Sequence, residues 1–252
     1  MGRLFLGTSG YCYDDWRGVL YPPGLPERSW LAHYATEFSA LELNATFYRL
    51  PSTSAVDGWR DATPERFIFA AKGSRYLTHL KRLRAPARGL DRYFARVDHL
   101  GHKLAVVLWQ LPPQMAHPDP ERLDHFLSRT PEDVRHAFDF RHPAWYTPEI
   151  CDVLDAHGAA FVEHDLVDRA PPRPTGGFRY LRFHGATARH LGRYGGRRLA
   201  HTAHALAAWT AHGDAFVFFN NDRLGHAVRD ARDFMRLAAT PLTHEEPRPS
   251  LS

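Results

Sequence analysis

Eight short apolar runs in this chain each end in polar or charged residues, and this recurrence constrains the fold more than any other feature of the sequence. A strand that enters a core is expected to stay apolar, because a buried charge without a partner is strongly destabilising. Eight such endings therefore predict one shared polar site. The runs finish at Gly7-Thr8-Ser9, Glu42-Leu43-Asn44, Ala71-Lys72, Trp109-Gln110, Asp139-Phe140-Arg141, His164-Asp165, Arg182-Phe183-His184 and Asn220-Asn221-Asp222.

The apolar runs alternate with helical segments, a pattern that favours a parallel sheet covered by helices. Strands are predicted at residues 4–8, 40–44, 67–72, 103–111, 136–141, 159–165, 178–184 and 215–221. Helices are predicted at 29–38, 51–61, 119–128, 148–157, 199–212 and 224–237, with at least one more before residue 100.

Eight such units in 252 residues predict an α/β protein with a single (β/α)8 TIM barrel. We expect the barrel domain to cover residues 1–239 and a loose C-terminal tail to cover 240–252. An open doubly wound sheet is the alternative. No G-x-G-x-x-G motif or P-loop follows the first strand, which argues against a nucleotide-cofactor fold.

The composition fits a large globular core. Hydrophobic residues make up 44% of the chain and include 16 Phe, 10 Tyr and 6 Trp. No run approaches the roughly 18 apolar residues of a membrane helix, and the apolar start of the chain is too short for a signal peptide. We therefore expect a soluble, cytoplasmic protein without a membrane partner. Cys12 and Cys151 lie far apart and predict neither a disulfide framework nor a cysteine zinc site.

Positive charge is unevenly distributed, although the formal net charge is only +4. The segment from Arg169 to Gly213 contains no Asp or Glu, and we interpret it as an anion-binding surface. Its arginines are Arg169, Arg173, Arg179, Arg182, Arg189, Arg193, Arg197 and Arg198. A second basic stretch runs from Arg75 to Lys103. We interpret it as the solvent-exposed face of a mostly helical segment.

Side chains alternate along a strand, so residues two apart face the same way. If the shared face is the barrel interior, carboxylates, cations and an imidazole meet at the C-terminal mouth, where barrel enzymes bind their substrates. We predict Glu42, Asp139 and His184 as catalytic residues. The predicted substrate-binding residues are Asn44, Lys72, Gln110, Arg141, Asp165, Arg182, Asn220, Tyr48 and Trp145. The alternative is a structural plug in which Lys72 and Arg141 neutralise Glu42 and Asp139.

The segment Arg182-Phe183-His184-Gly185 is the most informative local motif. It combines an arginine, which binds anions through two hydrogen bonds, with a histidine, a residue type that titrates near neutral pH. The loop at 186–198 that follows is rich in glycine and arginine. Barrels often bind phosphate with the loops after strands seven and eight, so we expect an anion near Arg182 or residues 189–198. The alternative is an ordinary surface loop broken by Gly195 and Gly196.

A metal site has less support in the sequence. Oxygen and nitrogen ligands could come from Glu42, Asp139, Asp165, His79 and His184, but no H-x-H or H-E-x-x-H spacing occurs. A divalent metal is therefore a possible cofactor that the pattern does not favour. A serine nucleophile is not indicated either, because Gly7-Thr8-Ser9-Gly10 lacks the G-x-S-x-G spacing.

Several of these motifs together resemble the domain of unknown function 72 family. The resemblance rests on Gly7-Thr8-Ser9-Gly10 with Trp16 and Tyr21-Pro22, Glu42-Leu43-Asn44-Ala45-Thr46-Phe47-Tyr48, Lys72 with Thr78-His79, Gln110-Leu111-Pro112-Pro113, Phe140-Arg141-His142 with Trp145, Arg182-Phe183-His184-Gly185 and Asn220-Asn221. It covers the chain to about Leu237 and implies a (β/α)8 barrel, while it carries no catalytic roles.

The leading functional hypothesis is an enzyme that binds a phosphate-bearing or other anionic substrate at the mouth and hydrolyses phosphodiesters, nucleic acid among them. Glu42 or Asp139 would be the base, His184 the acid, and the arginines the charge stabilisers. An isomerase or epimerase for sugar phosphates is the enzymatic alternative, with Lys72 polarising a carbonyl. A non-catalytic module that binds nucleic acid or anions is the third hypothesis. The expected partner is an anionic small molecule or nucleic acid, and the sequence points to no protein partner.

Overall fold

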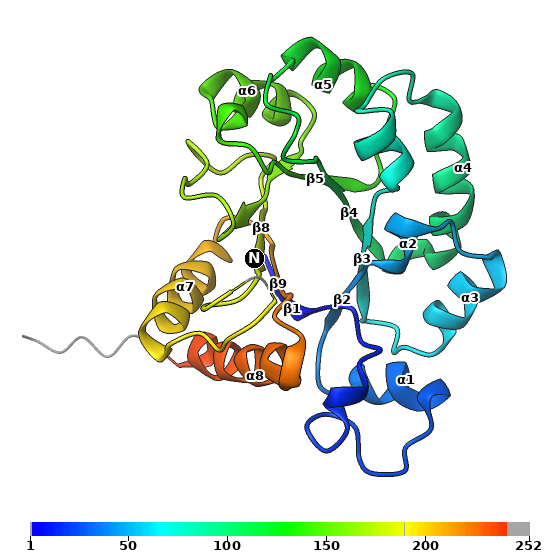
Figure 1. Cartoon of the computed structure of the whole chain (residues 1–252), viewed down its shortest axis with the longest axis vertical. Helices are drawn as coiled ribbons and strands as arrows, with labels where there is room; N and C mark the ends of the chain where they lie inside the picture. The colour runs from blue at the N-terminus through cyan, green and yellow to red at the C-terminus, as the bar shows by residue number, and fades with distance from the viewer. Residues whose placement is uncertain (1, 189, 241–252) are drawn as a thin grey trace, which may run out of the picture.

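The computed structural model describes residues 2–188 and 190–240, which form a ring of parallel strands surrounded by helices (Figure 1). Each predicted strand is present, with ends that shift by one or two residues. The strands are β1 (Leu4–Ser9), β2 (Ala40–Leu43), β3 (Ile68–Lys72), β4 (Leu104–Gln110), β5 (Arg135–Asp139), β6 (Ala160–Phe161), β7 (Glu163–His164), β8 (Arg179–Phe183) and β9 (Ala215–Phe219).

The ring closes through β6 and β7, which are two halves of one segment separated only by Val162. β6 pairs with β5, and β7 pairs with β8, both in parallel. The strand order β6-β5-β4-β3-β2-β1-β9-β8-β7 therefore returns to the segment from which it started. Counting β6 and β7 as one strand gives the eight of a (β/α)8 barrel, so the predicted TIM-barrel fold is confirmed.

Helices cover the outside of the ring. They are α1 (Trp30–Tyr34), α2 (Ala45–Tyr48), α3 (Thr53–Asp61), α4 (Ala87–Val97), α5 (Pro120–Leu127), α6 (Pro148–Ala156), α7 (Gly196–Trp209) and α8 (His226–Ala239). Ser52 caps α3 by accepting a hydrogen bond from the backbone amide of Ala55 at 3.2 Å, as its serine-rich start predicts. None of the helices in the described part of the chain is long and apolar enough to span a membrane.

The helix bounds differ from the predicted ones by up to four residues, and α7 lies three residues earlier than predicted. α1 ends at Tyr34 instead of residue 38. α8 begins at His226 instead of residue 224, because Leu224 and Gly225 adopt left-handed φ angles of 58° and 67° that cannot continue a right-handed helix. Residues 241–252, the greater part of the predicted tail, lie outside the described residues.

The barrel interior has an apolar layer below a polar one. The apolar layer includes Phe5, Ala40, Ala70, Leu108, Ala137, Tyr180 and Phe218. Two residues further along most of these strands, on the same inward face, the side chains become polar. The outward faces of the strands pack against the helices in a second, larger apolar cluster. The alternation of the strands therefore places the polar layer at their carboxyl ends.

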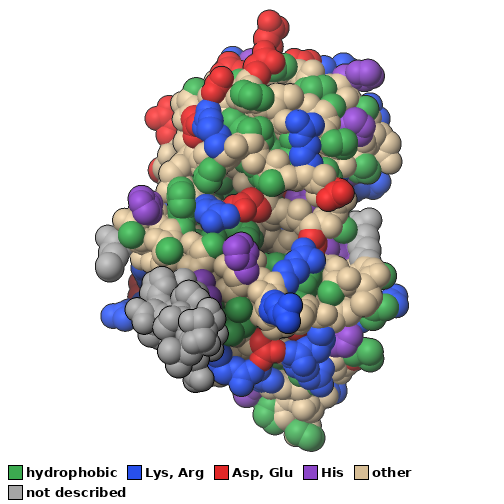
Figure 2. All heavy atoms as spheres, turned by 90° about the vertical axis from the view of Figure 1, so that its left-hand side faces the viewer, with side chains coloured by type: hydrophobic (Ala, Val, Ile, Leu, Met, Phe, Trp, Pro, Cys, Tyr) green, Lys and Arg blue, Asp and Glu red, His purple; other side chains and the backbone are tan. Residues whose placement is uncertain are grey.

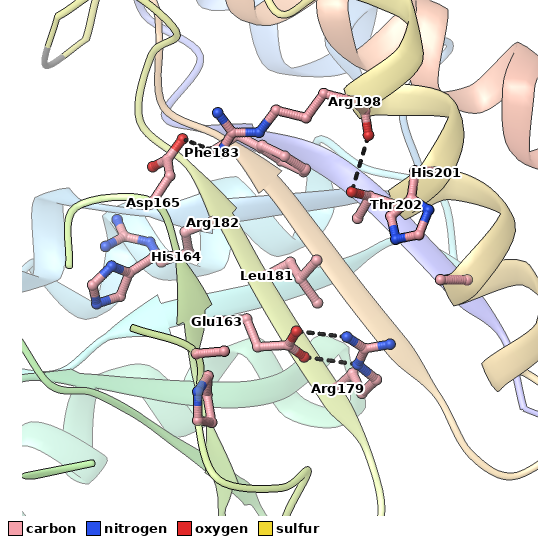
Figure 3. Close-up of a pocket in the computed structure, with 13 residues that line it drawn as sticks. Glu163, His164, Asp165, Arg179, Leu181, Arg182, Phe183, Arg198, His201 and Thr202 are labelled. Atoms are coloured by element: carbon pink, nitrogen blue, oxygen red, sulfur yellow. Dashed lines mark hydrogen bonds and ion pairs between the residues drawn. The ribbon is translucent and has the colours of Figure 1, made fainter. Parts of the chain in front are cut away.

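Residues 165–178 connect β7 to β8 by an irregular segment, in which the structure describes no helix. Figure 1 shows loops in the interval between α6 and α7 where a barrel helix would lie. The irregular segment leaves a groove of about 300 Å³ between β7, β8 and α7. Figure 3 shows Glu163 and Arg179 facing each other in this groove, with Arg179 Nε donating to Glu163 Oε1 at 2.7 Å.

Gly7→Ala is expected to destabilise the barrel, because an added Cβ would lie 1.9 Å from the carbonyl oxygen of Ala40 in the neighbouring strand. Overpacking of a rigid interior lowers the free energy of unfolding by about 1–3 kcal/mol. Gly58→Ala in α3 is the matched control, since its Cβ meets nothing within 4 Å and alanine favours a helix by about 0.5–1 kcal/mol. Urea denaturation should separate the two variants; equal stabilities would contradict this account of the close approach between β1 and β2.

Candidate functional site

A layer of buried polar side chains closes the barrel interior at the carboxyl ends of the strands. Strand register places Ser9 beside Glu42 and Gln110 beside Asp139. The layer consists of Ser9, Glu42, Lys72, Gln110, Asp139, Arg182 and Asn220. The structure thus brings together most of the residues that the sequence assigns to the mouth.

Arg182 of β8 connects the two carboxylates of this layer. Its Nε and Nη2 donate to the two carboxylate oxygens of Glu42 at 2.9 and 2.6 Å. Its Nη1 donates to Asp139 Oδ2 at 2.7 Å. The arginine is 2% exposed and both acids are 0% exposed, so these charges interact without water. Arg182 therefore bridges β2 and β5 across the interior.

Further donors satisfy the remaining capacity of the two carboxylates. Ser9 Oγ and the Tyr180 hydroxyl each donate to Glu42 at 2.7 Å. Arg141 forms an ion pair with Asp139 through Nε and donates from Nη2 at 2.6 Å. His164 Nε2 lies 3.2 Å from Asp139 Oδ1. A buried ionic network is stable only when its members are paired in this way.

The same contacts set the protonation of the two acids. Burial alone raises the pKa of Glu42, but the charge and hydrogen bonds of Arg182 outweigh it and leave the pKa below its usual value. Burial likewise opposes ionisation of Asp139, and Arg141, His164 and Arg182 hold its pKa well below the ordinary range. Both groups are ionised and fully bonded. They are consequently poorly suited to the role of general base that the sequence suggests.

His184 is similarly committed. Arg141 Nη2 can only donate, so His184 Nε2 accepts its hydrogen bond at 3.0 Å and the ring proton sits on Nδ1, which faces Asp165 Oδ1 at 3.2 Å. Burial and the neighbouring guanidinium groups lower the pKa of His184 well below 6.5. The ring is neutral and its Nε2 carries no proton, which conflicts with the predicted role of general acid.

The carboxylate of Asp165 is directed toward His184 and Tyr194 and holds the His184 ring in position. Its carboxylate accepts hydrogen bonds from the backbone amide of His184 at 3.0 Å and from the hydroxyl of Tyr194. Burial raises its pKa, but these donors outweigh it and lower the pKa to about 2. Figure 3 shows Arg198 of α7 reaching toward this carboxylate from the groove side, at 3.4 Å.

Lys72 differs from every other charged member of the layer. Its side chain is 8% exposed, and no hydrogen bond or ion pair reaches Nζ from the residues that the structure describes. Nζ lies 4.4 Å from the centre of the Phe47 ring. Burial first, and then repulsion from Arg182, lower its pKa from 10.5 to about 7. About half of the Lys72 side chains are therefore neutral amines near neutral pH.

A π-helical turn after β3 carries a histidine that lies near Lys72. Residues Tyr76–Leu80 form a π-helical turn, a rare element that is frequent at functional sites. The turn holds His79 with its ring edge against Phe47, at 5.1 Å between centroids. Burial and the charge of Lys72 lower the pKa of His79 to about 4. Lys72 therefore sits beside an aromatic ring and a neutral imidazole.

The other predicted substrate-binding residues fall into two groups. Asn44, Gln110 and Asn220 lie at the mouth, and Asn44 Oδ1 is a buried oxygen without a hydrogen-bond partner among the described residues. Tyr48 is 77% exposed on α2, outside the polar layer. Trp145 is 1% exposed and donates its indole N–H to the carbonyl of Met115 at 2.6 Å, so it is a packing residue of the core.

Two residues of the site are absent from the predicted catalytic and substrate-binding residues, although Asp222 belongs to one of the polar run endings that predict the site. Tyr180 belongs to the apolar run of its strand, although its spacing of two from Arg182 indicates that both face inward. Asp222 follows β9, and its Oδ1 is buried without a partner in the described part of the chain. Burial, with a smaller contribution from Asp15, raises its pKa to about 6. Asp222 can therefore exchange a proton near neutral pH, unlike the acids at the centre.

Most of the described arginines in the acid-free segment from Arg169 to Gly213 have acidic partners in the folded chain. Acids from other parts of the sequence reach five of them: Asp152 and Asp155 pair with Arg173, Glu163 with Arg179, Glu42 and Asp139 with Arg182, Asp230 and Asp233 with Arg193, and Asp165 with Arg198. Figure 2 shows acidic and basic side chains intermingled on one face of the molecule. Arg189 lies outside the described residues, so the anion expected there stays a prediction.

The possible metal ligands named from the sequence do not converge. Within residues 2–188 and 190–240, no group of three or more His, Cys, Asp and Glu side chains is arranged to hold a metal ion. Glu42 and Asp139 face Arg182 instead, and His184 faces Asp165 and Arg141. The arrangement is an ion-pair network with one unpaired amine beside it.

The fold and the site define a (β/α)8 barrel whose mouth holds a buried ionic layer, and comparisons place it in a family. The chain belongs to the family described as protein of unknown function DUF72, whose model matches residues 5–251, so the expected family membership is confirmed. The UPF0759 protein YunF of Bacillus subtilis is 24% identical over 275 residues, covering 93% of this chain and 94% of that protein. The UPF0759 protein YecE of Escherichia coli is 28% identical over 116 residues, 46% of this chain and 43% of that protein.

Solved structures agree with the fold. A DUF72 family protein, TM1631 from Thermotoga maritima, has a TM-score of 0.84 and 27% identity, covering 93% of this chain and 98% of that chain. A second DUF72 family protein, EF0366 from Enterococcus faecalis, has a TM-score of 0.77 with 19% identity, over 97% of this chain and 98% of that one. The second likeness shows the shared fold alone.

Arg182→Met is expected to lower the free energy of unfolding by about 3–5 kcal/mol near pH 7, because it leaves the buried Glu42 carboxylate without its main partner and removes one donor from Asp139. Without the guanidinium the folded-state pKa of Glu42 should rise above its unfolded value, so the loss should shrink as the pH falls toward about 5. Arg173→Met, which removes an exposed pair, should change stability by less than about 1 kcal/mol. Denaturant titrations at both pH values provide the test; an Arg182 effect as small as that of Arg173 would contradict the bridging role.

Asp222→Asn is expected to stabilise the protein above about pH 6, by up to about 3 kcal/mol for a pKa shift of about two units and less because the group is partly solvated. A raised folded-state pKa means that the wild type loses stability as the pH climbs from about 4 to about 6. Asp214→Asn should have the opposite effect, because Arg135 pairs with Asp214 at 2.6 Å. The same sign in both variants would show that Asp222 is not an unsatisfied acid.

Proposed function

We propose that this protein is an enzyme that isomerises or epimerises a small anionic hydroxy-carbonyl compound, a sugar phosphate or a close relative, with Lys72 as the group that moves the proton. One observation carries the proposal: a buried amine with a pKa of about 7 stands in the mouth without an acidic partner among the described residues. A base is most effective when its pKa lies near the working pH. Lys72 meets that condition, and Glu42 and Asp139 do not.

The step follows from the neighbours of Lys72. The neutral Nζ takes the proton from the carbon next to the substrate carbonyl, and the electron pair of that C–H bond moves toward the carbonyl oxygen as an enediolate forms. The resulting ammonium then returns the proton to the former carbonyl carbon while the hydroxyl proton of the enediolate passes to the former carbonyl oxygen, which moves the carbonyl by one carbon and gives the isomer. Return of the proton to the first carbon gives the epimer when the enediolate has turned its opposite face toward Nζ. No atom or electron is gained or lost.

Arg141 is suited to stabilise the negative charge that develops on the oxygen. Its Nε and Nη2 are bonded to Asp139, but Nη1 has no hydrogen-bond partner within the described residues. The charge of Arg141 also acts on Lys72 and helps to lower its pKa. Asn44, Gln110 and Asn220 line the same mouth with amide groups that can orient hydroxyls.

Hydrolysis of phosphodiesters receives less support from the geometry. It would assign the base to Glu42 or Asp139, but both carboxylates are fully hydrogen-bonded and their pKa values are lowered, which makes them weak bases. It would assign the acid to His184, whose Nε2 carries no proton. The isomerase needs no rearrangement of this network. The sequence suggests that Lys72 of an isomerase would polarise the substrate carbonyl. In the proposed reaction Lys72 instead moves the proton, and Arg141 stabilises the charge on the oxygen.

Lys72→Met is expected to abolish proton exchange at the carbon next to the carbonyl. Proton NMR in deuterated water, with a panel of phosphorylated and carboxylated aldoses and ketoses, would follow the loss of the signal from that carbon. Lys81→Met is the matched control, since Lys81 is an exposed lysine outside the mouth. Exchange that is equally fast in both variants, or absent with every compound of the panel, would contradict the proposal.

The pH dependence of this exchange separates catalysis by Lys72 from a structural effect. The amine must be neutral to accept a proton, so the rate should rise with pH through about 7 and then level off. Lys72→Arg preserves the positive charge but cannot become neutral, so it should be as inactive as Lys72→Met. A rate that falls as the pH rises from about 6 to about 8 would assign the proton transfer to another group.

A further inference from the structure

A second hollow opens beside the mouth, on the outer side of the wall that carries Lys72. It has a volume of about 500 Å³ and lies between α2, the π-helical turn Tyr76–Leu80 and the first turns of α4. Its lining includes Tyr48, Arg49, Arg75, Tyr76, Arg88 and Arg92, which we call the basic groove. Three of these arginines belong to the basic stretch that the sequence suggests is an ordinary solvated face.

The charge of the basic groove is not neutralised by the protein. In the part of the chain that the structure describes, no acidic side chain pairs with Arg49, Arg75, Arg88 or Arg92, and all four are exposed. This contrasts with the acid-free segment after Arg169, where most of the described arginines have acidic partners. Four unpaired guanidinium groups around one hollow produce a positive potential that attracts phosphates.

Exposed apolar side chains gather in the same place. Seven large apolar side chains are exposed among the described residues, and four of them, Tyr48, Leu50, Tyr76 and Leu80, line this groove. Tyr48 is 77% exposed and Tyr76 is 49% exposed, and Lys81 Nζ lies over the Tyr76 ring, 5.7 Å from its centre. Clustered exposed apolar groups mark interaction sites, whereas scattered ones do not.

The groove is also held in shape by its own framework. Tyr48 packs edge to face against Phe47, with ring centroids 4.9 Å apart. The segment after the π-helical turn places Arg82, Leu83 and Ala85 at left-handed φ angles of 49°, 66° and 45°. Such strained residues persist where the surrounding structure fixes them, and Leu83 is fully buried. The rings and arginines are therefore presented by a fixed backbone.

We propose that the basic groove binds single-stranded nucleic acid. Bases can stack on Tyr48 and Tyr76 while the backbone phosphates pair with the arginines, which is the combination that sequence-tolerant single-strand binding requires. A neighbouring hollow lined by Trp59 and Arg96 shares Arg49 and Leu50 with the basic groove. The two hollows together lengthen the surface that a single strand can contact. A duplex keeps its bases stacked inside and cannot use the two rings. This inference does not depend on the reaction proposed for Lys72.

The test is fluorescence anisotropy of a labelled oligothymidylate of about 12 nucleotides at about 20 mM salt. Arg88→Ala/Arg92→Ala should weaken binding about tenfold or more and reduce the slope of log affinity against log salt by about 0.7 for each phosphate that the protein no longer neutralises. The control is Arg66→Ala/Arg129→Ala, which removes the same charge from exposed positions that precede β3 and β5, at the opposite end of the barrel. It should change the affinity less than about twofold.

Tyr48→Ala/Tyr76→Ala should weaken binding roughly fivefold or more without altering the salt slope, because it removes stacking and no charge. Circular dichroism would verify that each variant folds. Equal weakening by the two arginine pairs would overturn the proposal in favour of diffuse surface charge. Absence of wild-type binding at low salt, or equally tight binding of a duplex of the same length, would overturn it as well.

Discussion

The contact of Arg182 with Glu42 and Asp139 is the interaction on which the rest of the site depends. It joins side chains from β8, β2 and β5 inside the barrel, where three charges are removed from water at a large desolvation penalty. The arrangement is stable because every carboxylate oxygen has donors, including those from Ser9 and Tyr180. The strands must therefore keep their register for the network to exist, and the network in turn fixes what the mouth can present to a ligand.

The charge balance of this network explains the unusual lysine. Two carboxylates face two guanidinium groups, those of Arg182 and Arg141, so the attraction of Glu42 and Asp139 for a proton on Lys72 is smaller than the combined effect of burial and of the two arginines. Burial and the nearby arginines then favour the neutral amine. Had Lys72 paired with Glu42, as the structural-plug alternative supposes, the same burial would have been opposed by a direct partner. In the proposed reaction the amine is therefore the reactive group, while the carboxylates hold the surrounding network in place.

The fold and the position of the site at the carboxyl ends of the strands could be predicted, because both follow from local patterns in the sequence. Strand and helix alternation gives the barrel, and the two-residue period places Asp139 with Arg141, and Arg182 with His184, on one face. Pairing could not be predicted, since Glu42 and Arg182 lie 140 residues apart and meet only because the ring closes. For the same reason the lack of acids within the segment from Arg169 to Gly213 does not mean that its arginines are unpaired. Arg193, for example, is neutralised by Asp230, which lies outside the segment. Trp145 is expected from the sequence to bind substrate at the mouth but is buried in the core, because the exposure of a side chain depends on tertiary packing that sequence spacing does not encode.

The central claim is that the mouth holds a lysine whose amine is neutral near physiological pH, and its pKa can be measured directly. The chain contains only three lysines, Lys72, Lys81 and Lys103, so a protein labelled with ¹³C-lysine gives three side-chain signals in a heteronuclear NMR titration. The account predicts that one signal, absent from Lys72→Met, titrates near pH 7, and that Arg182→Met moves its midpoint upward, because the repulsion from Arg182 is removed and Glu42 loses its guanidinium partner. A Lys72 signal that titrates near the ordinary lysine value of about 10.4 in the wild type would contradict the account.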